Sequence, residues 1–266
     1  MKKTISILGY VIPALLILFF AFGFLLAPHD PYHVDMSIRF QPPGSGYPLG
    51  TDNMGRCVLS RLLYGGRTTL AIILGGSLLV AFFGCIAGLL LGGTTGQKTV
   101  WLESLFNAVT AIPPIAYLII FISAWGNGVR TMLSAVTVSL LLRLLKLVKS
   151  RTETELAKAY IMCALASGAD HYRILFFHIF PNLIRDVMNF ICMSAADMVL
   201  SIVGFSFIGL GLGDNVIDWG TMVSETHHYI IAYPGLTMYP VAFIFLCTLS
   251  LYLLGHQISL GGNPYA

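Results

Sequence analysis

Paired histidines are the first residues whose types and spacing could do chemistry, because imidazole nitrogens bind Ni²⁺ and Zn²⁺. His227 and His228 are adjacent, and His29 and His33 lie on either side of Asp30. Metal sites generally need three or four ligands at fixed spacings. The five cysteines include no C-x-x-C pair that could supply the others. We therefore interpret these histidines as solvated loop residues and predict no metal site.

Two enzymatic possibilities remain, a serine nucleophile and a phosphate-binding loop. Ser206 lies in a long apolar run, and a nucleophilic serine needs a histidine base within hydrogen-bond distance. The candidate, His256, lies near the far end of the last apolar run, so roughly 25 Å of helix would separate the two. Residues 92–99 resemble a phosphate-binding loop, but Gln97 interrupts the pattern and no strand precedes it. We predict that this chain neither catalyses a reaction nor binds ATP. The alternative to this prediction is an intramembrane serine protease, which the distance between Ser206 and His256 disfavours.

The composition indicates that these residues are positioned within a membrane. The chain has 266 residues, of which 56% are hydrophobic and 10% charged, and its mean hydropathy is +0.81. A soluble domain carries about 25% charged residues. The net charge of +3 is typical of a basic cytoplasmic face, and no basic patch interleaved with aromatics predicts nucleic-acid binding.

We predict an all-α membrane protein of about six transmembrane helices, because the apolar runs reach the roughly 20 residues that a 30 Å hydrocarbon core requires. The predicted spans are 5–27, 67–95, 104–125, 130–149, 185–212 and 234–255. Pro113 and Pro114 predict a kink in the third span. The chain then divides into a first transmembrane helix at 1–27, an extracytoplasmic segment at 28–66 and a larger transmembrane domain at 67–266.

Basic residues are distributed unequally between the connecting segments. With the N-terminus inside, ten of the fifteen lie on the cytoplasmic side: Lys2, Lys3, Lys98, Arg143, Lys146, Lys149, Arg151, Lys158, Arg173 and Arg185. The remaining five lie outside: Arg39, Arg56, Arg61, Arg67 and Arg130. The positive-inside rule therefore predicts cytoplasmic N- and C-termini and a cytoplasmic segment at 150–184.

Two features lie within the predicted spans. Asp197 is an ionisable residue in the fifth span, where such residues are costly and usually functional. It could line a translocation path or pair with a polar group of a neighbouring subunit. Gly84, Gly88 and Gly92 repeat at every fourth residue, which allows close helix contact in lipid. We predict a helix–helix contact there, at the translocation path or a subunit interface.

The cytoplasmic segment contains signals for two helices. Thr152 and Glu155 have the spacing of a capping box, which predicts that a helix begins there. Gly168 is placed to end this helix, and Asp170 to cap a second one.

The second helix, at 171–180, is unusually apolar for a cytoplasmic element. It includes Ile174, Phe177 and Ile179, and we predict that it stops at Pro181. Such a surface has to be buried. It could pack on its own bundle or insert into a groove of a partner protein.

Four blocks of sequence resemble known motifs and follow one another along the chain: Pro48–Arg56 with Val58–Gly65, Gly168–Asn182, Ser206–Gly211 with Asp218–Met222, and Tyr233–Gly255. In this order they resemble the peptide/nickel-type permeases of ABC importers, in particular the dipeptide and nickel "C" subunit. The resemblance covers most of the chain. It departs at Cys57, at Met162 and at His256, and Met162 replaces a glutamate that the family keeps at the ATPase contact.

The resemblance implies a transport subunit of a bacterial inner membrane. Its expected partners are a second homologous permease, two cytoplasmic ATPases that bind ATP and Mg, and an extracytoplasmic solute-binding protein, with no cofactor on this chain. The residues it implies for ATPase coupling are Ala164, Gly168, Ala169, Ile174, Phe177, His178, Pro181 and Asn182. The solute, whether nickel, a metal chelate or a peptide, is left open, with the short chain favouring nickel or a small chelate. A purely structural membrane subunit would not explain the apolar cytoplasmic helix.

Overall fold

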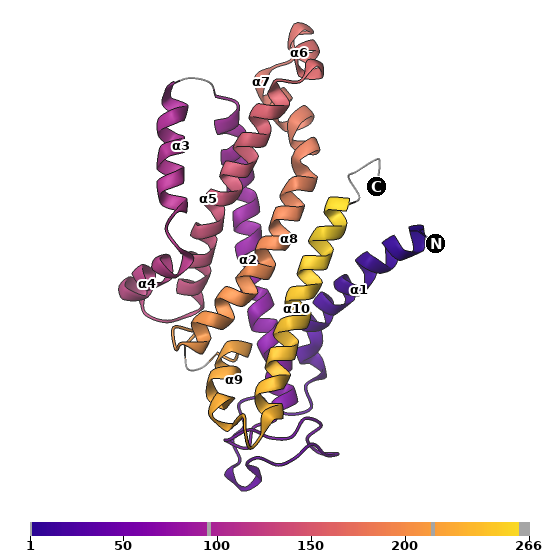
Figure 1. Cartoon of the computed structure of the whole chain (residues 1–266), viewed down its shortest axis with the longest axis vertical. Helices are drawn as coiled ribbons and strands as arrows, with labels where there is room; N and C mark the ends of the chain where they lie inside the picture. Colours follow the sequence, from indigo (N-terminus) through magenta and orange to yellow (C-terminus); the bar gives the residue numbers. More distant parts are fainter. Residues whose placement is uncertain (1, 95–96, 214–215, 261–266) are drawn as a thin grey trace.

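The computed structural model describes residues 2–94, 97–213 and 216–260, and most of them lie in helices that run along one axis (Figure 1). Five of these helical segments are long and apolar enough to cross a membrane. The five helices are α1 (Lys2–Phe22), α2 (Val58–Gly92), α5 (Val129–Leu156), α8 (Phe180–Phe207) and α10 (Pro234–Leu260). The predicted all-α membrane fold is confirmed.

The third predicted span is two helices rather than one kinked helix. Helix α3 (Gln97–Thr110) and helix α4 (Pro114–Trp125) meet at an angle of 78°. The break falls where the sequence placed it, because Pro113 and Pro114 cannot donate helical hydrogen bonds and restrict the residues before them. Counted as one broken span, α3 and α4 bring the total to six.

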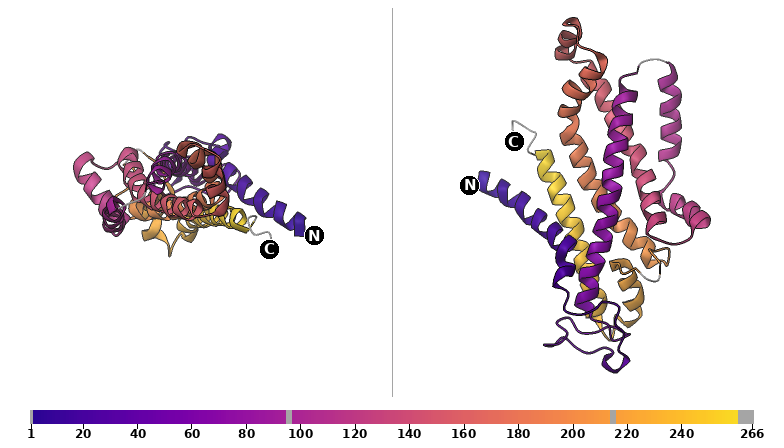
Figure 2. Two further views of the ribbon diagram at one scale, coloured as in Figure 1. Left: turned by 90° about the horizontal axis from the view of Figure 1, so that it is seen from above. Right: turned by 180° about the vertical axis from the view of Figure 1, so that it is seen from behind.

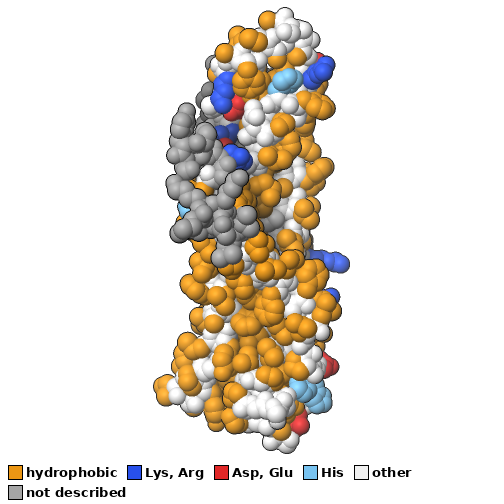
Figure 3. All heavy atoms as spheres, turned by 90° about the vertical axis from the view of Figure 1, so that its right-hand side faces the viewer, with side chains coloured by type: hydrophobic (Ala, Val, Ile, Leu, Met, Phe, Trp, Pro, Cys, Tyr) orange, Lys and Arg blue, Asp and Glu red, His pale blue; other side chains and the backbone are white. Residues whose placement is uncertain are grey.

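The start of α1 and the end of α10 lie on the side of the bundle that carries α6 (Ala159–Ala166) (Figures 1 and 2). The segment after α1 and helix α9 (Trp219–Thr226) lie at the opposite end. This arrangement is the one that cytoplasmic termini and an extracytoplasmic segment after α1 require. On the face in Figure 3, hydrophobic side chains cover the middle, and charged ones gather mainly toward the two ends.

Helices α2 and α5 pack closely along the axis of the bundle. An added Cβ at Gly88 would lie 2.7 Å from Cβ of Val148 and 2.9 Å from the carbonyl oxygen of Leu145, both on α5. Gly84 and Gly92 face α5 at similarly short distances. The predicted helix–helix contact is therefore present, and it is formed inside the chain rather than on an open face.

The first cytoplasmic helix does not begin at the predicted capping box. Thr152 is buried inside α5, where its hydroxyl donates to the carbonyl oxygen of Val148, and α5 continues to Leu156. Helix α6 begins only at Ala159. A Thr-x-x-Glu pattern is favourable at a helix start but does not interrupt a helix that packing already holds.

The second cytoplasmic helix does not stop at Pro181. Helix α7 (His171–Arg173) leads into a π-helix, η3 (Ile174–Ile179), and this runs directly into α8, where Pro181 lies in the first turn. Proline within an α-helix would lose one hydrogen bond and clash with the carbonyl four residues earlier. The wider π turn before Pro181 relieves that conflict.

Helix α2 begins at Val58, before residue 67 where the predicted span starts, so the last residues of the predicted extracytoplasmic segment are helical. Short 3₁₀ turns occupy Gly23–Leu26, Met36–Ile38 and His227–Tyr229. At this end Trp219 of α9 is fully buried, and its ring meets Phe20 and Phe243 edge-on. The outer end of the bundle is thus closed by an aromatic cluster.

Candidate functional site

The cytoplasmic tip is shaped by the turn between α6 and α7. Gly168 has φ +81°, and its amide donates to the carbonyl oxygen of Leu165, while the amide of Ala169 donates to that of Ala164. This pair of bonds is a Schellman motif, which requires a left-handed residue at Gly168. The carboxylate of Asp170 then accepts from the amide of Tyr172. The predictions for Gly168 and Asp170 are confirmed.

The apolar side chains of the next turns divide between two environments. Ile174 and Ile179 are buried against α2, α5, α6 and α8, so of the two alternatives these side chains pack on their own bundle. Phe177 is 77% exposed and Phe176 is 37% exposed. A π-helix points its residues in directions that a 3.6-residue period does not predict. The open surface is therefore centred on Phe177, with exposed Tyr172 beside it.

The start of α8 is tied to α6 by a tyrosine that sequence reasoning missed. The side-chain Nδ2 of Asn182 donates to the hydroxyl of Tyr160 at 2.9 Å, and that hydroxyl donates to Oε2 of Glu155 at 2.7 Å. His178 and Pro181 lie in the same turns. Met162, at the position of the family's glutamate, is 61% exposed on α6. The residues implied for coupling are thus brought together at one end.

Asp197 lies well inside the span formed by α8, roughly 15 Å from Phe207 at 1.5 Å per residue. It is exposed, whereas Ala196 and Met198 beside it are buried. Leu200 and Phe207, which follow at helical spacing, are exposed as well. The carboxylate therefore lies on a face of α8 that the rest of the described chain leaves uncovered.

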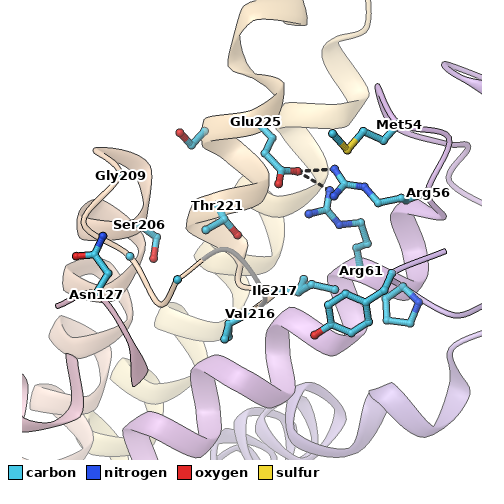
Figure 4. Close-up of a pocket in the computed structure, with 15 residues that line it drawn as sticks. Met54, Arg56, Arg61, Asn127, Ser206, Gly209, Val216, Ile217, Thr221 and Glu225 are labelled. Atoms are coloured by element: carbon cyan, nitrogen blue, oxygen red, sulfur yellow. Dashed lines mark hydrogen bonds and ion pairs between the residues drawn. The ribbon is translucent and has the colours of Figure 1, made fainter. Parts of the chain in front are cut away.

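A polar pocket of about 480 Å³ opens at the outer end of the bundle (Figure 4). It lies between the segment after α1, the first turns of α2, the end of α8 and helix α9. Its polar lining residues are Arg56, Arg61, Asn127, Ser206, Thr221, Ser224 and Glu225. Of these, the sequence had singled out Ser206 alone, as a possible nucleophile.

Four charged residues form one ion-pair network beside this pocket. Nη2 of Arg56 and Nη1 of Arg61 both lie 2.7 Å from Oε2 of Glu225, as the dashed lines in Figure 4 show. Asp52 pairs with the same two arginines, also at 2.7 Å, and is almost completely buried. The network joins the first resembling block to α9, at a separation of up to 169 residues. Asp52, Arg56 and Arg61 belong to the first resembling block, but nothing in that block predicted their pairing with Glu225.

Helix α9 is held in place by the residue that caps its N-terminus, Asp218. Oδ1 of Asp218 accepts from the amides of Gly220 and Thr221, which completes a capping box. Oδ2 of Asp218 is buried, and the Ser206 hydroxyl lies beside the Asp218 carboxylate. Burial raises the pKa of the Asp218 carboxyl above its ordinary value. The carboxylate is therefore needed as a cap but is poorly solvated.

The residues considered for metal binding and catalysis do not form a site in the described part of the chain. His227 contacts the carbonyl oxygen of Ser224, and His29 stacks on Tyr47. Residues 2–94, 97–213 and 216–260 contain no group of three or more potential ligands that could hold a metal ion. Ser206 lies near the outer end of α8, and His256 near the cytoplasmic end of α10.

The sequence itself matches a family model over residues 81–259, more than half of the chain. The chain therefore belongs to the family of binding-protein-dependent transport system inner membrane components. Within that class it is the multi-pass permease subunit of an ABC importer of the dipeptide/nickel type. It is a transport subunit rather than an enzyme, because in such importers ATP hydrolysis belongs to separate subunits.

Several curated relatives align with nearly the whole chain. The dipeptide transport system permease DppC of Alkalihalophilus pseudofirmus is 28% identical, over 96% of this chain and 84% of the relative. The peptide transport system permease SapC of Escherichia coli is 30% identical, over 89% and 82%. The nickel transport system permease NikC of Escherichia coli K12 is 27% identical, over 94% and 91%.

A solved structure agrees with the fold. The MetNI methionine ABC transporter in an inward-facing conformation contains a chain that superposes with a TM-score of 0.57 at 16% identity. The superposition covers 76% of this chain and 95% of the other. At this identity the similarity establishes the helical arrangement and nothing about the solute.

Proposed function

We propose that this chain and a second homologous permease form the translocation path of an importer for nickel, a metal chelate or a small peptide. Two cytoplasmic ATPases would bind ATP and Mg, and an extracytoplasmic binding protein would deliver the solute across a bacterial inner membrane. The relatives named for dipeptide, peptide and nickel transport support this range of solutes. The chain agrees in length more nearly with the nickel permease, of which it covers 91%, than with the two peptide permeases.

The observation that carries the pairing is the uncovered face of α8. Asp197 is exposed there inside a membrane span, and a carboxylate facing lipid near the middle of a bilayer costs at least about 2.5 kcal/mol. A second permease or a hydrated path would remove that cost. Asp197 is therefore proposed to lie at the subunit interface or in the translocation path. Gly84, Gly88 and Gly92 would support this face indirectly, by holding α2 against α5.

The cytoplasmic end is proposed to be the ATPase-coupling surface. Phe177, with Phe176 and Tyr172, is an apolar surface at the start of the candidate span His171–Phe207, and the chain does not cover it. Ala164, Gly168, Ala169, Ile174, His178, Pro181 and Asn182 shape and support that surface. ATP can drive transport only if it binds more tightly to one conformation of the assembly than to the other. Because η3 is continuous with α8, a movement of this surface would be transmitted directly to the helix that carries Asp197.

The test combines assembly with uptake. The full chain, tagged and extracted from bacterial membranes, is expected to carry a second permease and an ATPase that hydrolyses ATP. Deleting the chain should abolish uptake of one solute among radioactive nickel, a nickel chelate and a labelled dipeptide. Asp197→Asn should reduce recovery of the second permease or reduce uptake without affecting insertion. Recovery of the chain alone, with all uptake unchanged by its deletion, would show the proposal to be wrong.

A further inference from the structure

We propose that the outer pocket binds a carboxylate of the transported solute on Arg56 and Arg61, and that Glu225 occupies this position in the structure as an internal substitute. The inference rests on the proposed transport function and narrows it. A solute that binds here is a small peptide or a metal chelate with a carboxylate. Once Glu225 is displaced, the two guanidinium groups face only the carboxylate of Asp52, and the resulting net positive charge disfavours a bare metal cation.

Asp52 holds the two arginines in position and is not itself available for exchange. Its Oδ1 accepts from the amides of Met54 and Arg56, at 2.8 and 3.0 Å. Its Oδ2 accepts from Nε of Arg56 and Nη1 of Arg61, at 2.7 Å each. With its side chain 2% exposed, Asp52 is a fixed part of the wall. The geometry of the guanidinium groups is thus set before any ligand arrives.

Glu225 differs from Asp52 in every respect that matters for exchange. Its side chain is 36% exposed, and a single oxygen, Oε2, receives both arginine bonds. It is carried by α9, a helix of eight residues. A partly solvated carboxylate can leave at lower cost than a buried one, because water replaces part of its interaction. Its departure would leave two aligned guanidinium groups facing the pocket without a pocket-side anion.

The pocket wall also holds a polar atom that the chain leaves unsatisfied. Arg61 has a side chain 4% exposed, and its Nε has no hydrogen-bond partner among the described residues. Buried polar groups without partners are rare and costly in native proteins. This nitrogen is of the kind that a polar ligand in the pocket would satisfy. The hydroxyl of Ser206, another lining residue, is buried beside the Asp218 carboxylate.

The size and location of the pocket suit a small solute. Its volume of about 480 Å³ falls within the range of roughly 300–1,000 Å³ that is usual for small-molecule sites. It opens at the end of the bundle that carries the segment after α1 and α9, the assigned outer end. Gly209, Gly211 and Gly213 line one side without side chains, which leaves room for the remainder of a ligand.

Competition with Glu225 makes the inference measurable. Met54→Cys places a thiol in the pocket lining, at a side chain that is 39% exposed. Met36→Cys is the control: it places a thiol on the same segment but outside the pocket lining, at a side chain that is 57% exposed. The full chain is expressed with its importer in spheroplasts washed free of soluble extracytoplasmic protein and labelled with an impermeant maleimide. The native thiols at Cys57, Cys85, Cys192 and Cys247 are buried.

Glycylglycine is expected to slow labelling of Met54→Cys several-fold, and its C-terminal amide is not. Neither compound should slow labelling of Met36→Cys. Adding Glu225→Gln should lower the concentration for half-protection on the order of tenfold, because a neutral amide competes weakly for two arginines. Arg56→Gln should abolish protection.

Equal protection by the acid and its amide, or none by either, overturns the inference, as does an unchanged half-protection concentration in Glu225→Gln. Protection that occurs only when the binding protein is added back would assign the carboxylate to that protein and would also overturn it. Solute uptake in the same cells tests the transport function separately, so a transporting importer without protection rejects the carboxylate site alone.

Discussion

Nε1 of Trp219 donates a hydrogen bond of 2.9 Å to the carbonyl oxygen of Leu62, which lies 157 residues earlier in the chain. The ring fills the space that two glycines leave open, since an added Cβ at Gly65 would lie 2.9 Å from Cδ1 of Trp219. An added Cβ at Gly66 would lie 3.2 Å from Cζ2 of Trp219 and 2.7 Å from the carbonyl oxygen of Phe20. Two resembling blocks, far apart in sequence, therefore interlock at the outer end of the bundle.

Trp219→Ala is expected to destabilise the chain by about 3–5 kcal/mol, because a fully buried aromatic side chain is removed. Trp219→Phe retains most of the apolar contact and should cost less. Thermal unfolding of the purified protein in detergent measures both. Trp125→Ala is the matched control, since Trp125 is 65% exposed; equal losses for Trp219→Ala and Trp125→Ala would contradict the prediction.

Gly88→Ala is expected to destabilise the bundle by about 1–3 kcal/mol through overpacking against Val148 and Leu145 of α5. At Gly75 the nearest atom to an added Cβ is 3.9 Å away, on Leu133. Gly75→Ala should therefore be neutral or slightly stabilising, as alanine favours helix. Unfolding in detergent compares the two variants, and a Gly88→Ala protein as stable as Gly75→Ala would disprove the close contact.

Phe177→Asp is expected to weaken ATPase association by about one to two decades, because seating one large side chain contributes roughly 1.5–3 kcal/mol. Insertion into the membrane should be unaffected, because the Phe177 side chain is 77% exposed and is not packed inside the bundle. The measurement is ATPase recovered per permease after extraction, together with uptake. Thr154→Asp, at an exposed position near the cytoplasmic end of α5, is the control. Full ATPase recovery with Phe177→Asp would show that the surface centred on Phe177 does not bind the ATPase.

Gly168→Val is expected to uncouple ATP hydrolysis from transport. A left-handed backbone costs about 1–2 kcal/mol for residues with a Cβ, and most for β-branched ones. No atom lies within 4 Å of an added Cβ at Gly168, so the effect is one of backbone conformation and not of crowding. Gly168→Asn should retain coupling, because asparagine tolerates this conformation. The ratio of ATP hydrolysed to solute transported distinguishes them; equal ratios would argue against a backbone requirement.

Asp218→Asn is expected to stabilise the chain relative to wild type increasingly as the pH rises. Burial raises the folded-state pKa of Asp218, so the folded protein binds a proton more tightly than the unfolded chain. Wild-type stability therefore falls as the pH rises from the unfolded value of 3.8 through the raised folded value. Asparagine keeps the Oδ1 cap and does not titrate. Melting temperatures at acidic and neutral pH check the sign, and an Asn advantage that shrinks toward neutral pH would refute it.

The sequence by itself determined the membrane class and the approximate spans, and it predicts the sides of the connecting segments. These depend on local hydropathy and on the count of basic residues, which need no knowledge of packing. Gly168 and Asp170 were predictable for the same reason, since a left-handed C-terminal turn and a side-chain cap are formed by neighbours in sequence.

Only the tertiary structure decided which apolar side chains of residues 174–179 are exposed and which are buried. Ile174 and Ile179 are buried and Phe177 is exposed because a π turn precedes Pro181, and this turn is stabilised by packing on α2 and α5. It likewise decided the pocket, where Arg61 meets Glu225 across 164 residues. No local pattern specifies such a contact, because the energy that holds these charges together exists only after the intervening helices have packed.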